Sequence, residues 1–328
     1  KIFMEENTEQ RVDLTLFSEK IQELKDRIAS VIVGQEQTVD LVLTAILANG
    51  HVLIEGVPGV AKTLLARLTA RLIDADFSRV QFTPDLMPSD VLGTTVFNMK
   101  TNGFDFHQGP IFADIVLVDE INRAPAKTQA ALFEVMEERQ ISIDGTTHRM
   151  GDLYTILATQ NPVEQEGTYK LPEAQLDRFL MKITMDYPSL EEEVNILERH
   201  HTNAALVKLD DIVPAITKEE LLSLRAFMNQ VFVDRTLLQY IALIVQQTRT
   251  SKAVYLGASP RASVAMLQSS KAYALLQGRD FVTPEDIKFV APYVLQHRLI
   301  LTAEAEMEGY SPVKAVSYTH LRAHETLM

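Results

Sequence analysis

The sequence predicts an α/β protein in which helices flank a five-stranded parallel sheet, followed by a domain made only of helices. Three observations support this prediction. Short apolar runs alternate with helical patterns over the first 200 or so residues, as in a parallel sheet with helical crossovers. A glycine-rich turn joins the first apolar run to a helix. Beyond about residue 200, strand patterns stop and helix starts become well marked.

Composition limits the classes of protein that fit. A length of 328 residues suggests about two domains, and 46% hydrophobic residues suffice for packed cores. No apolar run is long enough to span a bilayer, and the polar, acidic start lacks a signal-peptide pattern. The absence of cysteine excludes disulfides and thiolate metal sites. These features predict a cytoplasmic protein, and the net charge of −13 disfavours nucleic acid as the main partner.

Two helices and a short elbow precede the glycine-rich turn. Apolar positions at helical spacing predict a first helix over about residues 14–30, and a second helix ends near Asn49. Between them lies the apolar elbow, residues 31–35. It is either a packed turn or a flat apolar surface for a base.

Residues 51–64, HVLIEGVPGVAKTL, form the stretch around which the rest is organised. A buried strand over 52–54 leads into a glycine-containing turn that closes on Lys62 and Thr63 at a helix start. Backbone N–H groups in such a turn converge on an anion at the positive end of the helix. We expect Lys62 to reach the β- and γ-phosphates of a nucleotide and Thr63 to bind Mg²⁺. The alternative is a chance glycine-rich turn between a strand and a helix.

Ala61 departs from the usual phosphate-loop pattern, which has glycine before the lysine. A methyl group is tolerated there if the backbone is helical. We therefore interpret the stretch as a variant of the motif.

An inserted β-hairpin is predicted between the second and third strands of the sheet. Residues 79–82 form the second strand, and the segment 84–109 contains several turn signals. Asn102-Gly103 separates two short alternating pieces, 95–97 and 104–106, which is typical of a hairpin. We expect this hairpin to project from the core.

Two acids follow the third strand. Residues 115–118 are all branched and apolar, as in a strand buried on both faces, and they end in Asp119 and Glu120. In a nucleotide site the first acid would hold the Mg²⁺ shell and the second would deprotonate a water. The alternative is an ordinary solvated loop.

The remaining elements of the sheet follow in order. A helix is predicted over about 125–138 with Pro125 in its first turn, then a hairpin around the Asp-Gly turn at 144–145. The fourth strand, 155–159, leads to Asn161 and should be stopped by Pro162; the fifth is 180–185. The Asn161 amide could hold the attacking water or the γ-phosphate, or simply form a turn.

Ligands of parallel sheets bind at the carboxyl ends of the strands. Gly56, Asp119-Glu120 and Asn161 each follow a strand directly. The sequence therefore predicts that these groups make one site.

The helical part offers one further candidate. Helix starts are indicated by Thr217-x-x-Glu220, by Asp234 and by Thr283-Pro284. Ser259-Pro260 also begins a helix, so Arg261 lies in a first turn, where the helix dipole disfavours a cation and a bound anion would suit it.

Two other features carry no predicted function. The His200-His201 pair fits solvated surface because no third metal ligand accompanies it. The last residues, from about Ser317, lack a sustained apolar face, and we expect this tail to be foreign to the native protein.

Taken together, GVPGVAKT, LVDEINRAP, ATQNP, LDRF and GASPRA, in this order, resemble the MoxR family of AAA+ ATPases over about residues 31–316. The resemblance implies an AAA+ domain over 1–200 with an insert at about 84–109, a helical lid over 201–316 and a tail over 317–328. It also implies that ATP is bound between subunits of a ring, usually hexameric. Arg178 matches the arginine finger, which acts on the ATP of a neighbouring subunit, and Ala61 matches the family's own residue before the lysine.

The resemblance assigns roles to individual positions. Catalytic roles fall to Glu120, Asn161 (sensor 1), Arg178 and Arg261 (sensor 2), and Mg²⁺ to Thr63 and Asp119. The implied nucleotide-binding residues are Ile32, Val33, Gly34, Gly56, Val57, Pro58, Gly59, Val60, Ala61, Lys62, Thr63 and Leu64.

The resemblance further implies a chaperone that remodels client proteins, with ATP and Mg²⁺ as cofactors and a von Willebrand A domain protein as a partner. The insert would be a candidate pore element. Two alternatives stay open: a nucleic-acid motor, disfavoured by the acidic charge, and a nucleotide-gated scaffold, disfavoured by Glu120, Asn161 and Arg178.

Overall fold

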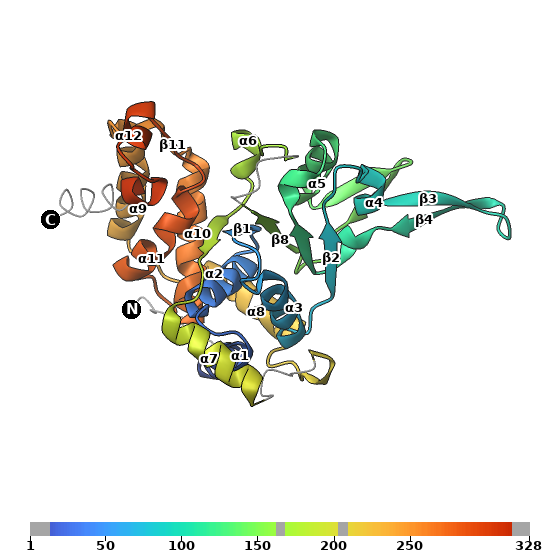
Figure 1. Cartoon of the computed structure of the whole chain (residues 1–328), viewed down its shortest axis with the longest axis horizontal. Helices are drawn as coiled ribbons and strands as arrows, with labels where there is room; N and C mark the ends of the chain where they lie inside the picture. The colour runs from blue at the N-terminus through green and yellow to red at the C-terminus, as the bar shows by residue number, and fades with distance from the viewer. Residues whose placement is uncertain (1–13, 162–167, 203–208, 317–328) are drawn as a thin grey trace, which may run out of the picture.

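A computed structural model describes residues 14–161, 168–202 and 209–316, and its centre is a five-stranded parallel sheet (Figure 1). All four strand pairs are parallel, which confirms the predicted sheet. In spatial order the strands are β2 (Phe77–Gln81), β5 (Ile115–Asp119), β8 (Thr155–Gln160), β1 (Val52–Gly56) and β9 (Met181–Met185).

Helices cover both faces of the sheet because successive strand residues point to opposite sides. On β5, Ile115 and Leu117 enter one core while Val116 and Val118 enter the other. The larger core contains α1 (Thr15–Val31), α2 (Glu36–Leu47) and α3 (Lys62–Leu72). The smaller core lies under α5 (Ala126–Glu138), which Pro125 precedes as the N-cap, one position before the predicted first turn.

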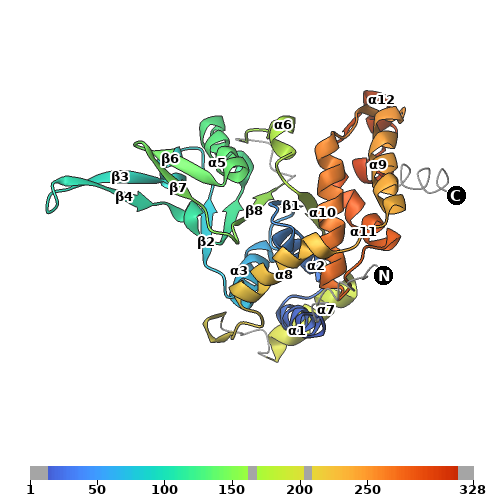
Figure 2. The ribbon, with the colours of Figure 1, turned by 180° about the vertical axis from the view of Figure 1, so that it is seen from behind.

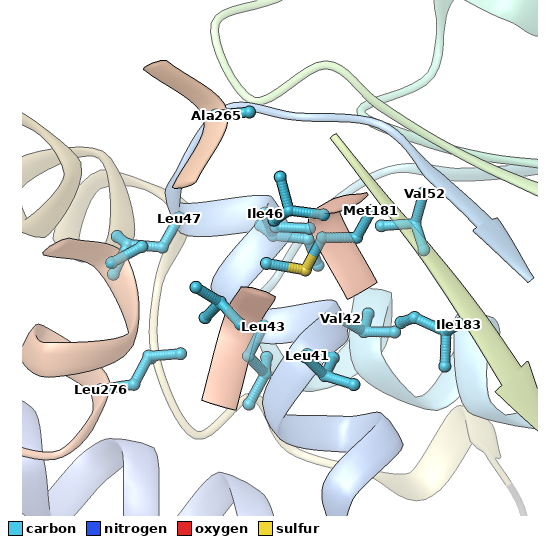
Figure 3. Packing of buried hydrophobic residues seen from close by; sticks show 14 of the residues in the cluster. Leu41, Val42, Leu43, Ile46, Leu47, Val52, Met181, Ile183, Ala265 and Leu276 are labelled. Atoms are coloured by element: carbon cyan, nitrogen blue, oxygen red, sulfur yellow. The ribbon is translucent and has the colours of Figure 1, made fainter. Parts of the chain in front are cut away.

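Helix α2 joins the sheet to the helical part of the chain. Its first turn is exposed at Glu36 and Gln37, but its residues from Leu41 to Leu47 are all buried, so the last two turns have no solvent face. They pack between β1 and β9 on one side and α10 (Pro260–Leu276) on the other (Figure 3). The hydrophobic core is therefore continuous from the sheet into the lid.

The lid is helical, as predicted, and its part from Arg235 onward lies at the opposite end of the molecule from the inserted hairpin (Figures 1 and 2). Its helices are α8 (Lys218–Phe227), α9 (Arg235–Thr250), α10, α11 (Pro284–Leu295) and α12 (Ala303–Met307), and α7 (Leu190–His201) precedes them. Thr217 and Thr283 begin capping boxes and Asp234 is an N-cap, which confirms these helix starts. The expected absence of strands was wrong at one point, because β10 (Val254–Leu256) and β11 (Ile300–Leu301) pair.

Both predicted hairpins are present. The insert contains β3 (Gly93–Asn98) and β4 (Gly103–Gln108), paired with Thr95 opposite Phe106, and it projects from the core (Figure 1). The second consists of β6 (Gln140–Ile143) and β7 (Thr146–Arg149) around the Asp-Gly turn. The sequence analysis missed the short helix α4 (Pro88–Leu92) because Pro88 was taken only as a turn signal, whereas it occupies the first turn of this helix.

Short helical segments complete the chain. They are η1 (Pro110–Phe112), η2 (Ile121–Arg123), α6 (Glu173–Leu176), η3 (Leu209–Asp211) and η4 (Met228–Gln230). Pro162 and the tail from Ser317 lie outside the described residues.

The backbone at Ala61 is left-handed, with φ 60° and ψ 23°. The sequence analysis expected helical backbone here, which would tolerate a methyl group, and this expectation was wrong. In this conformation the Cβ approaches the following carbonyl oxygen, at a cost of about 1–2 kcal/mol. Ala61 thus occupies a position that favours glycine, which explains the glycine of the usual motif.

His51 connects three elements in the interior. Its Nδ1 accepts a hydrogen bond from the backbone N–H of Ile156 in β8 at 2.9 Å. Its Nε2 therefore carries the proton and donates to the carbonyl oxygen of Met136 in α5 at 3.2 Å. Complete burial, with Arg139 nearby, lowers the pKa of His51 to about 3.

We expect Ala61→Gly to raise the free energy of unfolding by about 0.5–1 kcal/mol, since relief of the left-handed strain exceeds the entropy that glycine adds to the unfolded chain. Urea unfolding measures the change. Arg67→Gly, on the exposed face of α3, is the matched control and should lower stability by about 1 kcal/mol. A loss of stability in Ala61→Gly would contradict the backbone conformation described.

The stability of the protein should depend on pH through His51. Its folded pKa of about 3 lies below the ordinary value of 6.5, so the unfolded chain binds the proton more readily. The contribution of neutral His51 to the free energy of unfolding is complete above pH 6.5. It falls as the pH decreases toward 3, by up to about 1.4 kcal/mol per pH unit.

Unfolding midpoints measured between pH 7.5 and 5 should therefore depend less steeply on pH in His51→Gln than in the unmodified chain. The comparison uses the slope because His297, whose pKa burial also lowers, contributes to both proteins. Equal slopes would show that His51 is not the titrating group.

Candidate active site

The parallel sheet brings the predicted groups to one edge. Glu55 of β1 lies opposite Gln160 of β8, and Val118 of β5 lies opposite Ala158 of β8. Gly56, Asp119 and Asn161 are the next residues along these three strands. Neighbouring strands are about 4.8 Å apart, so the strand ends form one compact site.

The turn between β1 and α3 has the backbone of an anion-binding loop. Gly59, at φ 89°, and Ala61 are both left-handed, and no side chain caps the N-terminus of α3. Left-handed residues at alternate positions of a turn direct successive backbone N–H groups toward a common point. Gly56 is required by space, because a Cβ there would lie 2.8 Å from the carbonyl oxygen of Met185.

Three apolar residues anchor the turn to the larger core, and two other loop residues are more exposed. Val60 is buried in the larger core, and Val57 and Leu64 pack against that core. Thr63 is half-buried at the start of α3. Pro58 is exposed on the outside of the turn.

Lys62 lies close to the two acids. Its Nζ donates to the carbonyl oxygen of Gly56 at 2.7 Å. Partial burial lowers its pKa, and the charges of Asp119 and Glu120 partly oppose that shift. The structure therefore brings the partly buried Lys62 close to Asp119 and Glu120, which are more than 50 positions away in the sequence.

A hydroxyl from β8 links the two acids. The Thr159 Oγ1 donates to Asp119 Oδ1 at 3.0 Å and accepts from the backbone N–H of Glu120 at 3.0 Å. Glu120 itself is left-handed, with φ 55°. A non-glycine residue in this region costs on the order of 1–3 kcal/mol and is typical of functional positions.

Strand β2 supplies further partners for the acids. Arg79 Nε lies 2.5 Å from Asp119 Oδ2, and the Gln81 amide donates to Glu120 Oε2 at 3.1 Å. Arg123 Nε lies 3.2 Å from the same Glu120 oxygen. Arg79 and Gln81 alternate on one face of β2, a polar pattern that the sequence analysis did not use, and it also missed Thr159.

Asn161 directly follows β8 and is buried, with 8% of its surface exposed. Burial of an amide is costly unless its groups have partners, so this position is specific for a polar function or a structural hydrogen bond. The structure places Asn161 beside the loop and the acids by strand register, in agreement with the predicted position.

Arg178 and Arg261 meet at a carboxylate on α5. Arg178 donates to the carbonyl oxygen of Phe133, and its Nε lies 4.0 Å from Glu137 Oε2. Arg261 Nη2 lies 3.2 Å from Glu137 Oε1, and its Nη1 lies 3.8 Å from Asp177 Oδ2. The anions beside Arg261 in this structure are thus protein carboxylates, which the sequence analysis did not identify.

The apolar elbow packs against neighbouring helices. Ile32 is buried in the larger core, and Gly34 is left-handed with its Cα facing the carboxylate of Glu192 in α7. A cavity of about 270 Å³ between α1 and α2 touches Ile32 and is also lined by the Lys25–Asp40 ion pair. Contact of Ile32, Val33 and Gly34 with a base stays a prediction.

Two expected absences concern the described residues. His200 and His201 are exposed at the end of α7, and no three histidine or acidic side chains within residues 14–161, 168–202 and 209–316 are grouped to bind a metal by themselves. Over the same ranges, no helix has both the length and the apolar character needed to cross a bilayer.

Family models match both parts of the chain. Residues 51–181 match the ATPase family associated with various cellular activities (AAA), and residues 246–317 match an AAA lid domain. These ranges contain the loop, the acids, Asn161 and Arg178 in the first match, and Arg261 in the second.

Individual proteins match over most of their length. The chain is 49% identical to the uncharacterized protein YeaC of Bacillus subtilis, over 87% of this chain and 88% of that protein. It is 45% identical to the chaperone MoxR1 of Mycobacterium tuberculosis, over 87% and 77%. It is 30% identical to the protein MoxR of Methylorubrum extorquens, over 90% and 91%.

A solved structure has the same fold. The crystal structure of a candidate ATPase from Cytophaga hutchinsonii matches with a TM-score of 0.86 and 41% identity, covering 95% of this chain and 96% of that one. The agreement of sequence, sheet order and lid shows that this chain belongs to the MoxR family of AAA+ ATPases.

Proposed function

We propose that this chain binds ATP with Mg²⁺ at the carboxyl edge of the sheet and hydrolyses it. The observation that carries the proposal is the meeting of Lys62 with Asp119 and Glu120 beside a left-handed, uncapped turn. A cation and a ring of N–H groups suit the phosphates, and the two acids suit a metal and a water.

The residues present fit a magnesium nucleotide. The N-terminus of α3 offers free N–H groups because no side chain caps it, and Asp119 places a carboxylate at the buried strand end. The Thr63 hydroxyl and the Asp119 carboxylate would hold Mg²⁺, both being oxygen ligands that this ion prefers. When bound, Mg²⁺ supplies positive charge that neutralises the phosphate oxygens.

Hydrolysis needs a base and an oriented water. The Glu120 carboxylate would accept a proton from the attacking water, while Gln81 and Arg123 hold its Oε2 and Thr159 holds its backbone. The Asn161 amide would orient that water or the γ-phosphate. Lys62 would stabilise charge on the β- and γ-phosphates as the bond to the leaving phosphate breaks.

The proposed roles of Arg261 and Arg178 depend on the lid and on a neighbouring subunit. Arg261, on the lid, would bind the γ-phosphate in its own subunit or in the adjacent one. Arg178 would stabilise developing charge on the ATP of a neighbouring subunit, which requires a ring, hexameric by analogy with the family. Ile32, Val33 and Gly34 would lie beside the base.

We propose that hydrolysis drives remodelling of a client protein, with a von Willebrand A domain protein as partner, in the cytoplasm. The relative from Mycobacterium tuberculosis is named a chaperone, which supports this choice. The projecting β3–β4 hairpin would be the pore element. The net charge of −13 disfavours a nucleic-acid motor, and the complete set of hydrolytic groups disfavours a scaffold without turnover.

Two variants should separate binding from hydrolysis. Lys62→Ala should weaken ATP binding by about 10- to 100-fold because charge-assisted hydrogen bonds to the phosphates are lost. Glu120→Gln should bind ATP normally while turnover falls by about 100-fold or more, since only the base is removed.

Calorimetric titration with ATP and a phosphate-release assay measure the two effects. Lys127→Ala and Glu134→Gln, on α5, are the matched controls because both side chains are exposed. Normal ATP affinity in Lys62→Ala would refute the loop assignment, and normal turnover in Glu120→Gln would refute the base.

Subunit mixing tests whether Arg178 acts across an interface. Arg178→Ala should lower turnover by about 1,000-fold or more. Mixing it with Lys62→Ala subunits, which bind ATP weakly but keep Arg178, should restore part of the activity at intermediate ratios.

Arg235→Ala, an exposed arginine at the start of α9, is the control and should retain activity unmixed. If no mixing ratio raises the activity above that of the separate variants, Arg178 does not act in trans.

A further inference from the structure

Arg298 follows α11 of the lid, and its side chain is buried against the sheet domain with 5% exposed. Its Nε lies 2.7 Å from Asp177 Oδ1. Its Nη2 donates to the carbonyl oxygens of Phe179 at 2.8 Å and of Asp177 at 3.2 Å. Its Nη1 donates to the carbonyl oxygen of Leu180 at 3.1 Å. One guanidinium thus holds the backbone on both sides of Arg178.

The two residues before Arg298 contact the same segment. The His297 Nε2 donates to the carbonyl oxygen of Phe179 at 2.9 Å. The Gln296 amide donates to the carbonyl oxygen of Lys182 in β9. Three consecutive lid residues therefore make hydrogen bonds to the backbone of residues 177–182.

Charged groups extend this contact to the proposed catalytic arginines. Asp177 accepts from Arg298 and also lies 3.8 Å from Arg261. Arg261 shares Glu137 with Arg178. A continuous series of alternating charges thus runs from Arg298 to Arg178.

Burial makes this arrangement specific. A guanidinium that leaves water loses several kcal/mol of hydration unless its donors are satisfied. Here the partners are the Asp177 carboxylate, three backbone carbonyl oxygens of residues 177–180 and, within the lid, the carbonyl oxygen of Val294. Anchoring the lid to the sheet domain would require only the apolar contacts of α2, α10 and α11. The polar contacts, in addition, orient the segment that carries Arg178.

We propose that Arg298 is a positioning residue that holds the Arg178 segment to the lid, so that the lid and the trans-acting arginine move as one unit. A lid displacement in one subunit then changes the place of the arginine offered to the neighbouring ATP. This inference rests on the proposed function of Arg178.

Arg298→Lys tests the proposal with charge conserved. A lysine cannot satisfy five acceptors in the plane of a guanidinium, so Arg178 should be misplaced. We expect kcat to fall by about 10- to 100-fold while KM for ATP changes by less than about twofold.

The matched control is Arg279→Lys. Arg279, which is half-buried, pairs with the buried Asp286 at 2.6 Å within the same lid, and it donates hydrogen bonds to Asp286 and to the carbonyl oxygen of Phe281. Thermal unfolding of both variants measures the loss of stability that they share. An equal loss of kcat in Arg279→Lys would show that lid stability alone is responsible, and would overturn the proposal.

Subunit mixing provides the second readout. Arg298→Lys subunits keep their own ATP site, so mixing them with Lys62→Ala subunits should restore part of the activity, as for Arg178→Ala. Rescue of Arg178→Ala without rescue of Arg298→Lys would overturn the role of Arg298 and leave the proposed function intact. Absence of rescue for both would overturn the trans arginine, and the present inference with it.

A second variant, Asp177→Asn, keeps the proposal testable if Arg298→Lys does not fold. Asp177→Asn preserves volume and should reproduce the kcat loss if Arg298→Lys does not give folded protein. In addition, Arg178→Ala combined with Asp177→Asn should be no slower than Arg178→Ala alone, because both act through the same group. Multiplied losses in the double variant would overturn the proposal.

Discussion

Strand β8, hydrogen-bonded in parallel between β1 and β5, determines where the site can form. Its two ladders align the ends of three strands that are far apart in the sequence. These three strands are almost entirely buried, so their backbone N–H and C=O groups must be paired within the sheet. His51 strengthens this arrangement, since one ring joins the backbone of Ile156 to that of Met136 in α5.

The polar groups at this edge form a network in which each acid has a cationic or hydrogen-bonding partner. Thr159 links the side chain of Asp119 to the backbone of Glu120, Arg79 holds the second oxygen of Asp119, and Gln81 and Arg123 both hold Oε2 of Glu120. Asp119 and Thr159 are buried, so their hydrogen bond is shielded from water and keeps the carboxylate in a fixed orientation. A site arranged in this way needs little reorganisation when charge develops on a substrate.

The lid is attached by two kinds of contact with different consequences. The buried part of helix α2, from Leu41 to Leu47, packs on both the sheet and α10, so apolar burial holds the two parts together without strict orientation. The hydrogen bonds of Gln296, His297 and Arg298 to residues 177–182 are directional. The first kind supplies cohesion, and the second determines how the lid is oriented relative to the segment that carries Arg178.

Several features were predictable because their signals are local. Runs of branched apolar residues predicted the buried strands, Asn102-Gly103 and the Asp-Gly turn predicted the hairpins, and Thr217 and Thr283 predicted helix starts. The loop at 56–63 and the pair Asp119-Glu120 carry their chemistry in adjacent residues. The short helix α4 and the β10–β11 pair were missed because segments of two to five residues have too little periodicity to be recognised.

By itself, then, the sequence determined the order of strands and helices and the residues that end each strand, since these depend on neighbours along the chain. Only the tertiary structure decided which distant side chains meet. Thr159 with Asp119, Arg178 and Arg261 with Glu137, and Arg298 with Asp177 are separated by between 40 and 124 positions. Their contacts arise because strand register and the packing of α2 and α10 place the elements side by side, and no local pattern encodes that placement.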